Sequence, residues 1–254
     1  MRPNKIKQSW AQGRPVTMGW LAFANSFTAE IMARQGFDAL CIDMQHGVTS
    51  ESSLLEMLQA ISATDTVPVV RVAKNDPAAI MKALDWGAYG IVVPLINTAA
   101  DAVRAVSACR YPPLGTRSYG PVRAIHYGGA DYPTAANDEL LVMAMIETKE
   151  GLANLEEICG TNGLDAIYIG PADLSLALGL PPRMDNPDSL HIETCHRIRD
   201  TARHQGKKVC MHCASGVFAA DAIRRGFDLV VLTSDMNAMV AGARRQIDEF
   251  NSSI

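Results

Sequence analysis

The sequence is short of the features that mark several classes of protein. Its 23 Lys and Arg residues are scattered rather than clustered, and 27 Asp and Glu residues bring the net charge to −4. Because no basic stripe is present to gather phosphates, we expect no nucleic-acid partner. No apolar run approaches the roughly 18 residues of a membrane-spanning helix, and the polar N-terminus lacks the apolar core of a signal peptide. We therefore expect a cytoplasmic protein with no membrane partner.

Cysteine is also sparse, and its spacing argues against a metal or redox centre. The chain has six cysteines, and the one C-x-x-C runs from Cys210 to Cys213 inside an apolar segment. A structural zinc site usually needs a second ligand pair, but no other C-x-x-C and no H-x₃-H is present. In a strand, alternation would turn these two sulfurs to opposite faces. We expect buried thiols that pack as small apolar side chains.

What the sequence does contain is a regular alternation of β-rich runs and amphipathic helical segments. We expect strands at 17–23, 39–44, 68–73, 90–96, 141–147, 166–171, 208–213 and 229–234. Most are continuous apolar runs, which is typical of strands covered on both faces. Gly36, Gly87 and Gly226 close helical segments, and Pro77 opens one at a position where a missing N–H costs nothing.

Eight such units in 254 residues, with no break in composition, predict one (β/α)₈ TIM barrel domain over residues 1–254. A doubly wound sheet shares the alternation, but no G-x-G-x-x-G follows the first strand. We expect the segment 236–250 to complete the eighth helix. The segment 110–140 is too long for an ordinary connection, so we interpret it as a functional or interface loop.

Polar side chains gather where the predicted strands end. In a (β/α)₈ barrel the chemistry lies at the C-terminal ends of the strands. In this sequence those ends carry Asp43, Gln45, His46, Arg71, Glu147, Asp173, His212, Ser234 and Asp235. We therefore expect these residues to form one ring at the mouth of the barrel.

Glu147 and Asp173 each follow a fully apolar strand, one strand gap apart. Two close carboxylates raise each other's pKa unless a cation lies between them, and oxygen ligands suit Mg²⁺, Mn²⁺ or Co²⁺. Each acid taken alone is better explained as a helix N-cap, because helical segments start beside both. Taken with Arg71 and His46 at the same rim, the pair predicts a divalent metal site.

His46 and Arg71 are candidates for acting on a substrate. His46 closely follows Asp43, whose carboxylate could orient the imidazole and make it a better base. The alternative is a strand-end histidine bonded to backbone. Arg71 lies inside the strand 68–73, so an inward guanidinium needs an anionic partner such as a substrate carboxylate or oxyanion. An outward one would form a buried ion pair between helix and sheet.

Five segments resemble one enzyme family. They are "GFDALCIDMQHG", "PVVRVAKNDP", "RYPPLGTRSYG", "AMIETKEGLANLEEI" and "GLDAIYIGPADLSLALG". Together they resemble the metal-dependent (class II) pyruvate aldolases of the HpcH/HpaI family, which include the 2,4-dihydroxyhept-2-enedioate aldolase type. The resemblance implies a (β/α)₈ barrel and reversible aldol cleavage or addition between a 2-oxo acid and an aldehyde. It also implies a homo-oligomer, a trimer or hexamer, whose last helix packs on a neighbouring subunit.

The resemblance assigns catalytic roles to four residues. It implies that His46 is the base, with Asp43 beside it, and that Arg71 contacts the substrate and stabilises the transition state. An acid that makes the histidine more basic corresponds to Asp85 and would reach the site across a subunit contact. From the residues alone, Asp85 would be an ordinary surface acid.

The resemblance also assigns ligand-binding residues. Glu147 and Asp173 would bind the divalent metal, and the backbone N–H groups of Ala172 and Asp173 would bind the carboxylate of the 2-oxo acid. Gln45 stands where many relatives carry Glu, and we expect it to contact substrate. Met145 stands where relatives often carry Gln, a change that could move donor preference from pyruvate towards hydroxypyruvate.

Three other functions compete with this one. A class I aldolase would use a Schiff-base lysine at a strand end, but no lysine lies in the interior of an apolar strand: Lys208 only begins one, and Lys74 and Lys149 come after theirs. A lyase of the citrate lyase β-subunit or malyl-CoA lyase type shares the fold and the acid pair. Its acyl-CoA substrate would need a cluster of basic residues to bind the phosphates, and this sequence has no such cluster. A non-catalytic barrel that binds a metal or an oxo acid would need no base, so an inert His46→Ala variant would favour it.

Overall fold

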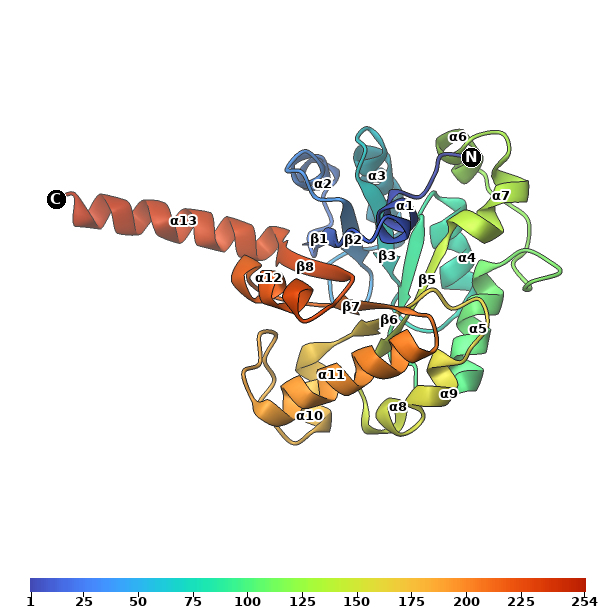
Figure 1. Ribbon diagram of the computed structural model, residues 1–254. Helices are drawn as coiled ribbons and strands as arrows, with labels where there is room; N and C mark the ends of the chain where they lie inside the picture. Colours follow the sequence, from blue (N-terminus) through green and yellow to red (C-terminus); the bar gives the residue numbers. More distant parts are fainter.

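Eight parallel strands close into a barrel in the computed structural model, which describes all 254 residues (Figure 1). The strands pair in chain order, and β1 pairs with β8 to close the ring. They are β1 (Val16–Leu21), β2 (Ala39–Asp43), β3 (Val67–Arg71), β4 (Gly90–Val93), β5 (Leu141–Ile146), β6 (Ala166–Ile169), β7 (Lys208–Met211) and β8 (Leu229–Ser234). Every strand expected from the sequence is present, and the (β/α)₈ fold is confirmed.

Helices alternate with these strands, and their ends follow the expected chemistry. Pro77 is the first residue of its helix, and Gly36, Gly87 and Gly226 adopt positive φ just after theirs. The helices are α1 (Lys5–Ala11), α2 (Ser26–Ala33), α3 (Glu51–Ser62), α4 (Pro77–Asp85), α5 (Ala99–Cys109), α6 (Ala124–Gly128), α7 (Tyr132–Glu139), α8 (Lys149–Ala153), α9 (Leu155–Cys159), α10 (Pro171–Ala177), α11 (Ser189–His204), α12 (Gly216–Arg224) and α13 (Asp235–Ser252).

The strands form the centre of one apolar core of 68 buried residues. Every residue of β2, β3, β4, β5 and β6 is buried, because helices cover the outside of the barrel and side chains fill the inside. This explains why the strands read as continuous apolar runs. No helix is both long enough and apolar enough to span a membrane.

The segment 110–140 lies at the end of the barrel opposite the C-terminal strand ends. It connects α5 to β5 and forms α6 and α7, so it is a helix-to-strand connection. Its Arg117 is buried and pairs with Asp85 over 2.6 Å. The N-terminal segment closes the same end, where Asn4 Nδ2 donates to the Glu139 carbonyl over 2.8 Å. Within one chain, the segment therefore seals this end of the barrel and does not serve the rim where the site was expected.

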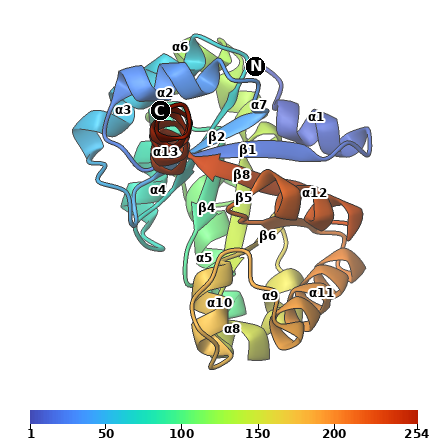
Figure 2. The same cartoon turned by 90° about the vertical axis from the view of Figure 1, so that its left-hand side faces the viewer.

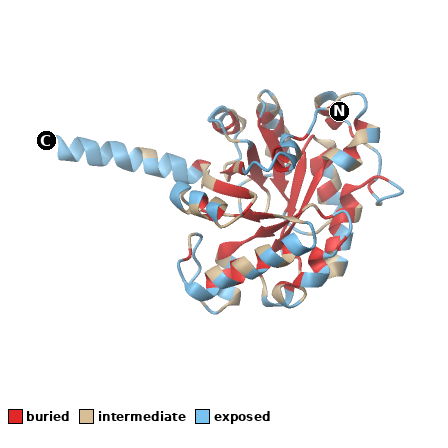
Figure 3. Ribbon diagram, viewed as in Figure 1, coloured by how far each residue is buried: buried red, intermediate tan, exposed pale blue.

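The last helix does not join the layer of helices around the barrel. α13 leaves the C-terminal end of β8 and projects away from the barrel (Figure 1), and it is seen end-on in Figure 2. Almost its whole length is exposed (Figure 3). The exposed residues include the apolar Met236, Met239, Val240, Ile247 and Phe250. The helix expected over 236–250 is therefore present as part of α13, but it does not pack on its own barrel.

Candidate active site

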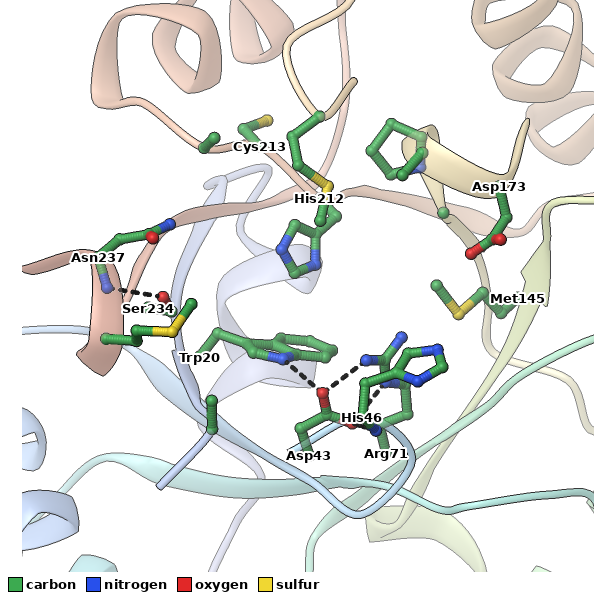
Figure 4. A pocket seen from close by; sticks show the side chains of 17 residues that line it. Trp20, Asp43, His46, Arg71, Met145, Asp173, His212, Cys213, Ser234 and Asn237 are labelled. Atoms are coloured by element: carbon green, nitrogen blue, oxygen red, sulfur yellow. Dashed lines mark hydrogen bonds and ion pairs between the residues drawn. The ribbon is translucent and has the colours of Figure 1, made fainter. Parts of the chain in front are cut away.

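A cavity of about 310 Å³ opens at the C-terminal ends of the strands (Figure 4). It is lined by Trp20, Ala22, Asp43, His46, Arg71, Met145, Gly170–Asp173, Met184, His212–Ala214, Ser234, Met236 and Asn237. The structure thus brings together six residues of the ring expected from the sequence, namely Asp43, His46, Arg71, Asp173, His212 and Ser234.

Asp43 and Arg71 form a buried ion pair in the cavity wall. They end β2 and β3 and are register partners, so their side chains emerge side by side. Arg71 Nε and Nη2 donate to Asp43 Oδ1 and Oδ2 over 2.8 and 2.6 Å, and Trp20 Nε1 donates to Oδ2 over 3.2 Å. Burial alone would raise the pKa of Asp43, but the hydrogen bonds and charge of Arg71 hold it below its ordinary value. Arg71 Nη1 donates to no protein group and remains available to a ligand.

The surroundings of His46 differ from the expectation. Asp43 Oδ1 accepts the backbone N–H groups of Gln45 and His46 over 3.0 and 3.2 Å, so the carboxylate fixes the turn after β2. The expected contact between Asp43 and the imidazole is absent, because Arg71, Trp20 and the turn already occupy both carboxylate oxygens. The His46 ring is exposed at the cavity and has no hydrogen-bond partner in the chain. It is therefore free to face a ligand or a water molecule.

Glu147 is a buried carboxylate with one unused oxygen. Its Oε1 accepts the Leu95 N–H over 2.9 Å, and its Oε2 accepts no hydrogen bond from the chain. Burial raises the pKa of Glu147 to about 7, and the charge of Asp173 adds to the rise, although the Leu95 N–H and Arg71 oppose it. A cation beside both acids would compensate this buried charge.

The two acids fit a metal site better than a helix-capping role. The N-cap of α8 is Thr148 and that of α10 is Gly170, so the N-cap interpretation of Glu147 and Asp173 is wrong. No group of three or more His, Cys, Asp or Glu side chains could hold a metal ion. Two carboxylates with water or substrate oxygens in the other positions are a donor set suited to a hard or borderline divalent ion.

The first turn of α10 adds free backbone donors. The first N–H groups of a helix have no partner within it, and no side chain caps α10. Pro171 has no N–H, so Ala172 and Asp173 carry these donors, and both residues line the cavity. An anionic group of a ligand would be stabilised there. The absence of a side chain at Gly170 brings this turn against Glu147 and Met145.

Three members of the expected ring, namely Gln45, Glu147 and Asp235, are not among the residues that line the cavity, and neither is Asp85. Gln45 lies beside the cavity, with its Oε1 buried and without a partner. Asp85 ends α4 at the opposite end of the barrel, where it accepts from Arg117 Nη2 over 2.6 Å. Burial raises the pKa of Asp85, although Arg117 opposes the rise. Asp235 is buried and accepts the backbone N–H groups of residues 22 and 23. Within one chain, Asp85 therefore lies away from the cavity, and the Asp235 carboxylate is already occupied by backbone donors.

Sequence reasoning missed Trp20 and Asn237 and found no role for His212. The His212 ring meets the Trp20 ring edge-on with 4.6 Å between centroids, and its Nδ1 lies 3.0 Å from Tyr168 Oη. Burial and the charge of Arg71 lower the pKa of His212 to about 3, so the ring is neutral. Trp20 could have been found as a large side chain near the end of β1, but Asn237 carries no such signal.

The C-x-x-C segment behaves as expected. Cys210 and Cys213 are buried free thiols. The Cys210 sulfur contacts Met143 Sδ, whereas the Cys213 sulfur contacts the carbonyl of Met211. The two thiols therefore pack in different places as small apolar groups.

Comparison with known proteins identifies the family. Residues 16–241 match the family model described as HpcH/HpaI aldolase/citrate lyase. The chain belongs to this family. A hydroxypyruvate/pyruvate aldolase of Rhizorhabdus wittichii is 41% identical over 244 residues, which cover 96% of this chain and 97% of that protein. A 4-hydroxy-2-oxo-heptane-1,7-dioate aldolase of Salmonella dublin is 40% identical over 188 residues, or 73% of this chain and 72% of that protein.

A solved structure of the HpcH/HpaI family agrees over nearly the whole chain. The crystal structure of a family member from Burkholderia cenocepacia J2315 superposes with a TM-score of 0.90 at 31% identity and covers 98% of this chain and 99% of its own. The resemblance seen in the five sequence segments is confirmed. With aldolases as its curated relatives, this HpcH/HpaI protein is a carbon–carbon lyase, and the relatives favour an aldolase over the acyl-CoA lyase alternative.

Proposed function

We propose that this protein is a divalent metal-dependent aldolase that joins and cleaves a 2-oxo acid and an aldehyde in the cavity of Figure 4. The observation that carries the proposal is the buried Glu147 beside Asp173, next to the cavity that Arg71 and His46 line. The names of the R. wittichii and S. dublin relatives support a 2-oxo acid, and the first of them supports pyruvate or hydroxypyruvate as the donor.

Glu147 and Asp173 would hold the metal, which we propose to be Mg²⁺, Mn²⁺ or Co²⁺. Glu147 offers its unused Oε2, and Asp173 offers an exposed carboxylate in the first turn of α10. When bound, such an ion would polarise the keto group of the donor.

The chain itself would orient the donor. The backbone N–H groups of Ala172 and Asp173 would bind the carboxylate of the 2-oxo acid. Arg71 Nη1 would donate to the keto oxygen or the aldehyde oxygen as negative charge develops there, and Asp43 keeps the guanidinium in place beforehand. A preorganised donor of this kind is worth about 3 kcal/mol in the transition state.

His46 would move the proton. In the cleavage direction its imidazole takes the proton of the C4 hydroxyl, directly or through one water. The C3–C4 bond breaks, the aldehyde leaves with a new carbonyl, and the bonding electron pair stays on the donor half until C3 is protonated. Addition is the reverse. The exposed, unbonded ring of His46 leaves room for that water.

We also propose a homo-oligomer, a trimer or hexamer, in which α13 packs on a neighbouring subunit. The exposed apolar side chains of α13 support it, because its own barrel leaves them uncovered. Asp85 lies too far from the cavity of its own chain to act there, so a role in proton transfer would be exerted on a neighbour's His46.

The proposal is tested by product formation. Pyruvate or hydroxypyruvate is incubated with glycolaldehyde, and the aldol product is detected by mass spectrometry before and after EDTA treatment. We expect a product only with a divalent metal, and product formation about 100-fold slower with an Arg71→Ala variant that remains folded. Product formation that EDTA does not affect would contradict the metal dependence.

A further inference from the structure

His212 lies in the cavity wall, and its contacts fix the orientation of its ring. It follows β7, its ring meets Trp20 edge-on at 4.6 Å, and its Nδ1 lies 3.0 Å from Tyr168 Oη. Its Nε2 has no hydrogen-bond partner in the chain and lies in a residue that lines the cavity. Nothing in the proposed mechanism uses this nitrogen.

The partner of Nδ1 decides which nitrogen carries the proton. Tyr168 is fully buried, and its hydroxyl has no hydrogen-bond partner other than His212. If Nδ1 carried the hydrogen, the buried O–H of Tyr168 would be left without an acceptor, which is costly. If Tyr168 donates to Nδ1, both groups are satisfied. The neutral ring of His212 then carries its hydrogen on Nε2 and offers it to the cavity.

The position of His212 indicates which part of a ligand it meets. Figure 4 shows His212 between Asp173 on one side and Ser234 and Asn237 on the other. Arg71 also packs on Trp20, with its guanidinium carbon 4.9 Å from the ring centroid. If the carboxylate of the donor lies at the N–H groups of Ala172 and Asp173 and its keto oxygen at Arg71, as proposed above, the third substituent of the keto carbon, C3, faces the rest of the cavity wall, which includes His212. C3 is the carbon at which the donor and the aldehyde are joined.

We propose that His212, oriented by Tyr168, is a specificity-determining residue whose Nε2–H donates to a hydroxyl on C3 of the 2-oxo acid, so that it favours hydroxypyruvate over pyruvate. The inference rests on the proposed aldolase function and adds the residue that distinguishes between the two donor substrates. Pyruvate has only a methyl group at this carbon and leaves the N–H without a ligand acceptor. Because the cavity is open to water, the N–H can then bond to water, so the expected discrimination is moderate rather than absolute.

The test measures the two donors separately, without any aldehyde. Exchange of the C3 protons with D₂O is followed by NMR on aliquots quenched with EDTA, for hydroxypyruvate and for pyruvate, with a no-enzyme control. The quantity compared is the ratio of kcat/KM for hydroxypyruvate to that for pyruvate. The variants are His212→Phe, which keeps a ring without a donor, His212→Gln, which restores an N–H, and Tyr168→Phe. His204→Phe, at the exposed end of α11, is the matched control.

We expect His212→Phe to lower the ratio about tenfold, the effect of one lost hydrogen bond, and His212→Gln to recover part of it. Tyr168→Phe should lower the ratio as well, because the ring can then adopt either tautomer, and His204→Phe should leave it as in the wild type. A ratio within about twofold of wild type in both His212→Phe and Tyr168→Phe would overturn the inference. If wild-type protein exchanges neither donor with any divalent metal, the aldolase function itself fails and the inference fails with it.

Discussion

A buried arginine can serve a ligand only if its charge is compensated and a donor is still left over. Asp43 meets both conditions for Arg71, because its carboxylate accepts hydrogen bonds from Nε and Nη2 and leaves Nη1 free to donate to a ligand. Trp20 covers the guanidinium at 4.9 Å, which adds a cation–π contact. The sequence showed that Arg71 needed an anionic partner, but it could not show that the partner is 28 residues away in the same chain. Only the register of β2 and β3 places the two side by side.

Asp43→Asn should therefore destabilise the fold strongly. The substitution leaves Arg71 buried without a counter-charge, which costs about 3–5 kcal/mol of unfolding free energy. Urea unfolding at pH 7 measures this, with Asp138→Asn as a control because Asp138 is exposed and its carboxylate bonds nothing. Equal unfolding free energies for Asp43→Asn and wild type would show that the ion pair of Asp43 and Arg71 does not stabilise the fold.

The same pair predicts the acid sensitivity of the fold. The pKa of Asp43 is lowered in the folded protein from an ordinary value of 3.8. The contribution of the Asp43 carboxylate to the unfolding free energy is thus fully present above pH 3.8, the ordinary pKa, and is lost as the pH falls through the lower pKa of the folded protein. We expect the stability difference between wild type and Asp43→Asn to be the same at pH 7 and pH 5 and to shrink below pH 4. A difference that already shrinks between pH 7 and pH 5 would contradict this assignment.

At the level of elements, the strands and most helix ends were predictable from local chemistry. Continuous apolar runs, Pro77 at a helix start and glycines at helix ends each act over a few residues, so the sequence alone reveals them. The positions and contacts of the Gln45 and Asp85 side chains were not predictable in this way. Gln45 turns its Oε1 into a buried position, and Asp85 faces a buried Arg117 from a distant loop. Both depend on tertiary packing that no local pattern reports.

The junction of β6 and α10 has no room for a larger residue at Gly170. A Cβ there would collide with the Glu147 carboxylate and with the Met145 side chain. Gly170→Ala should displace Glu147 and weaken Mn²⁺ binding about 10- to 100-fold, the usual effect of disturbing the support of a metal ligand. Isothermal titration calorimetry measures the affinity. Gly216→Ala, where a Cβ meets nothing within 4 Å, is the matched control and should bind as wild type does. Unchanged affinity in Gly170→Ala would argue that Glu147 is not a ligand.

At the level of the whole molecule, the projecting α13 is the feature that a single barrel does not explain. Met236, Val240, Ile247 and Phe250 recur at helical spacing on one face of it, and all are exposed. The sequence pattern predicted an amphipathic helix but not its direction, because an apolar face suits its own barrel and a neighbour's equally well. The direction is visible only in the fold (Figure 1).

A charged substitution on that face should separate the subunits. We expect wild-type protein to have the mass of a trimer or hexamer in light scattering after gel filtration. The double variant Ile247→Glu, Phe250→Glu should shift to a smaller species, because carboxylates in an apolar interface are costly. Ser252→Glu, on the opposite face of α13, should keep the wild-type mass. A monomeric wild type, or a double variant of unchanged mass, would contradict the proposed assembly.

The central claim is that the carboxylate pair Glu147 and Asp173 binds a divalent ion that allows a 2-oxo acid to lose a proton from C3. The most direct measurement is C3 proton exchange of pyruvate and hydroxypyruvate in D₂O, with EDTA-treated protein and with Mg²⁺, Mn²⁺ or Co²⁺ restored. We predict exchange of at least one donor only when a metal is present, and its loss in a folded Glu147→Gln variant. Exchange that persists in EDTA, or no exchange of either donor with any of the three metals, would contradict the account.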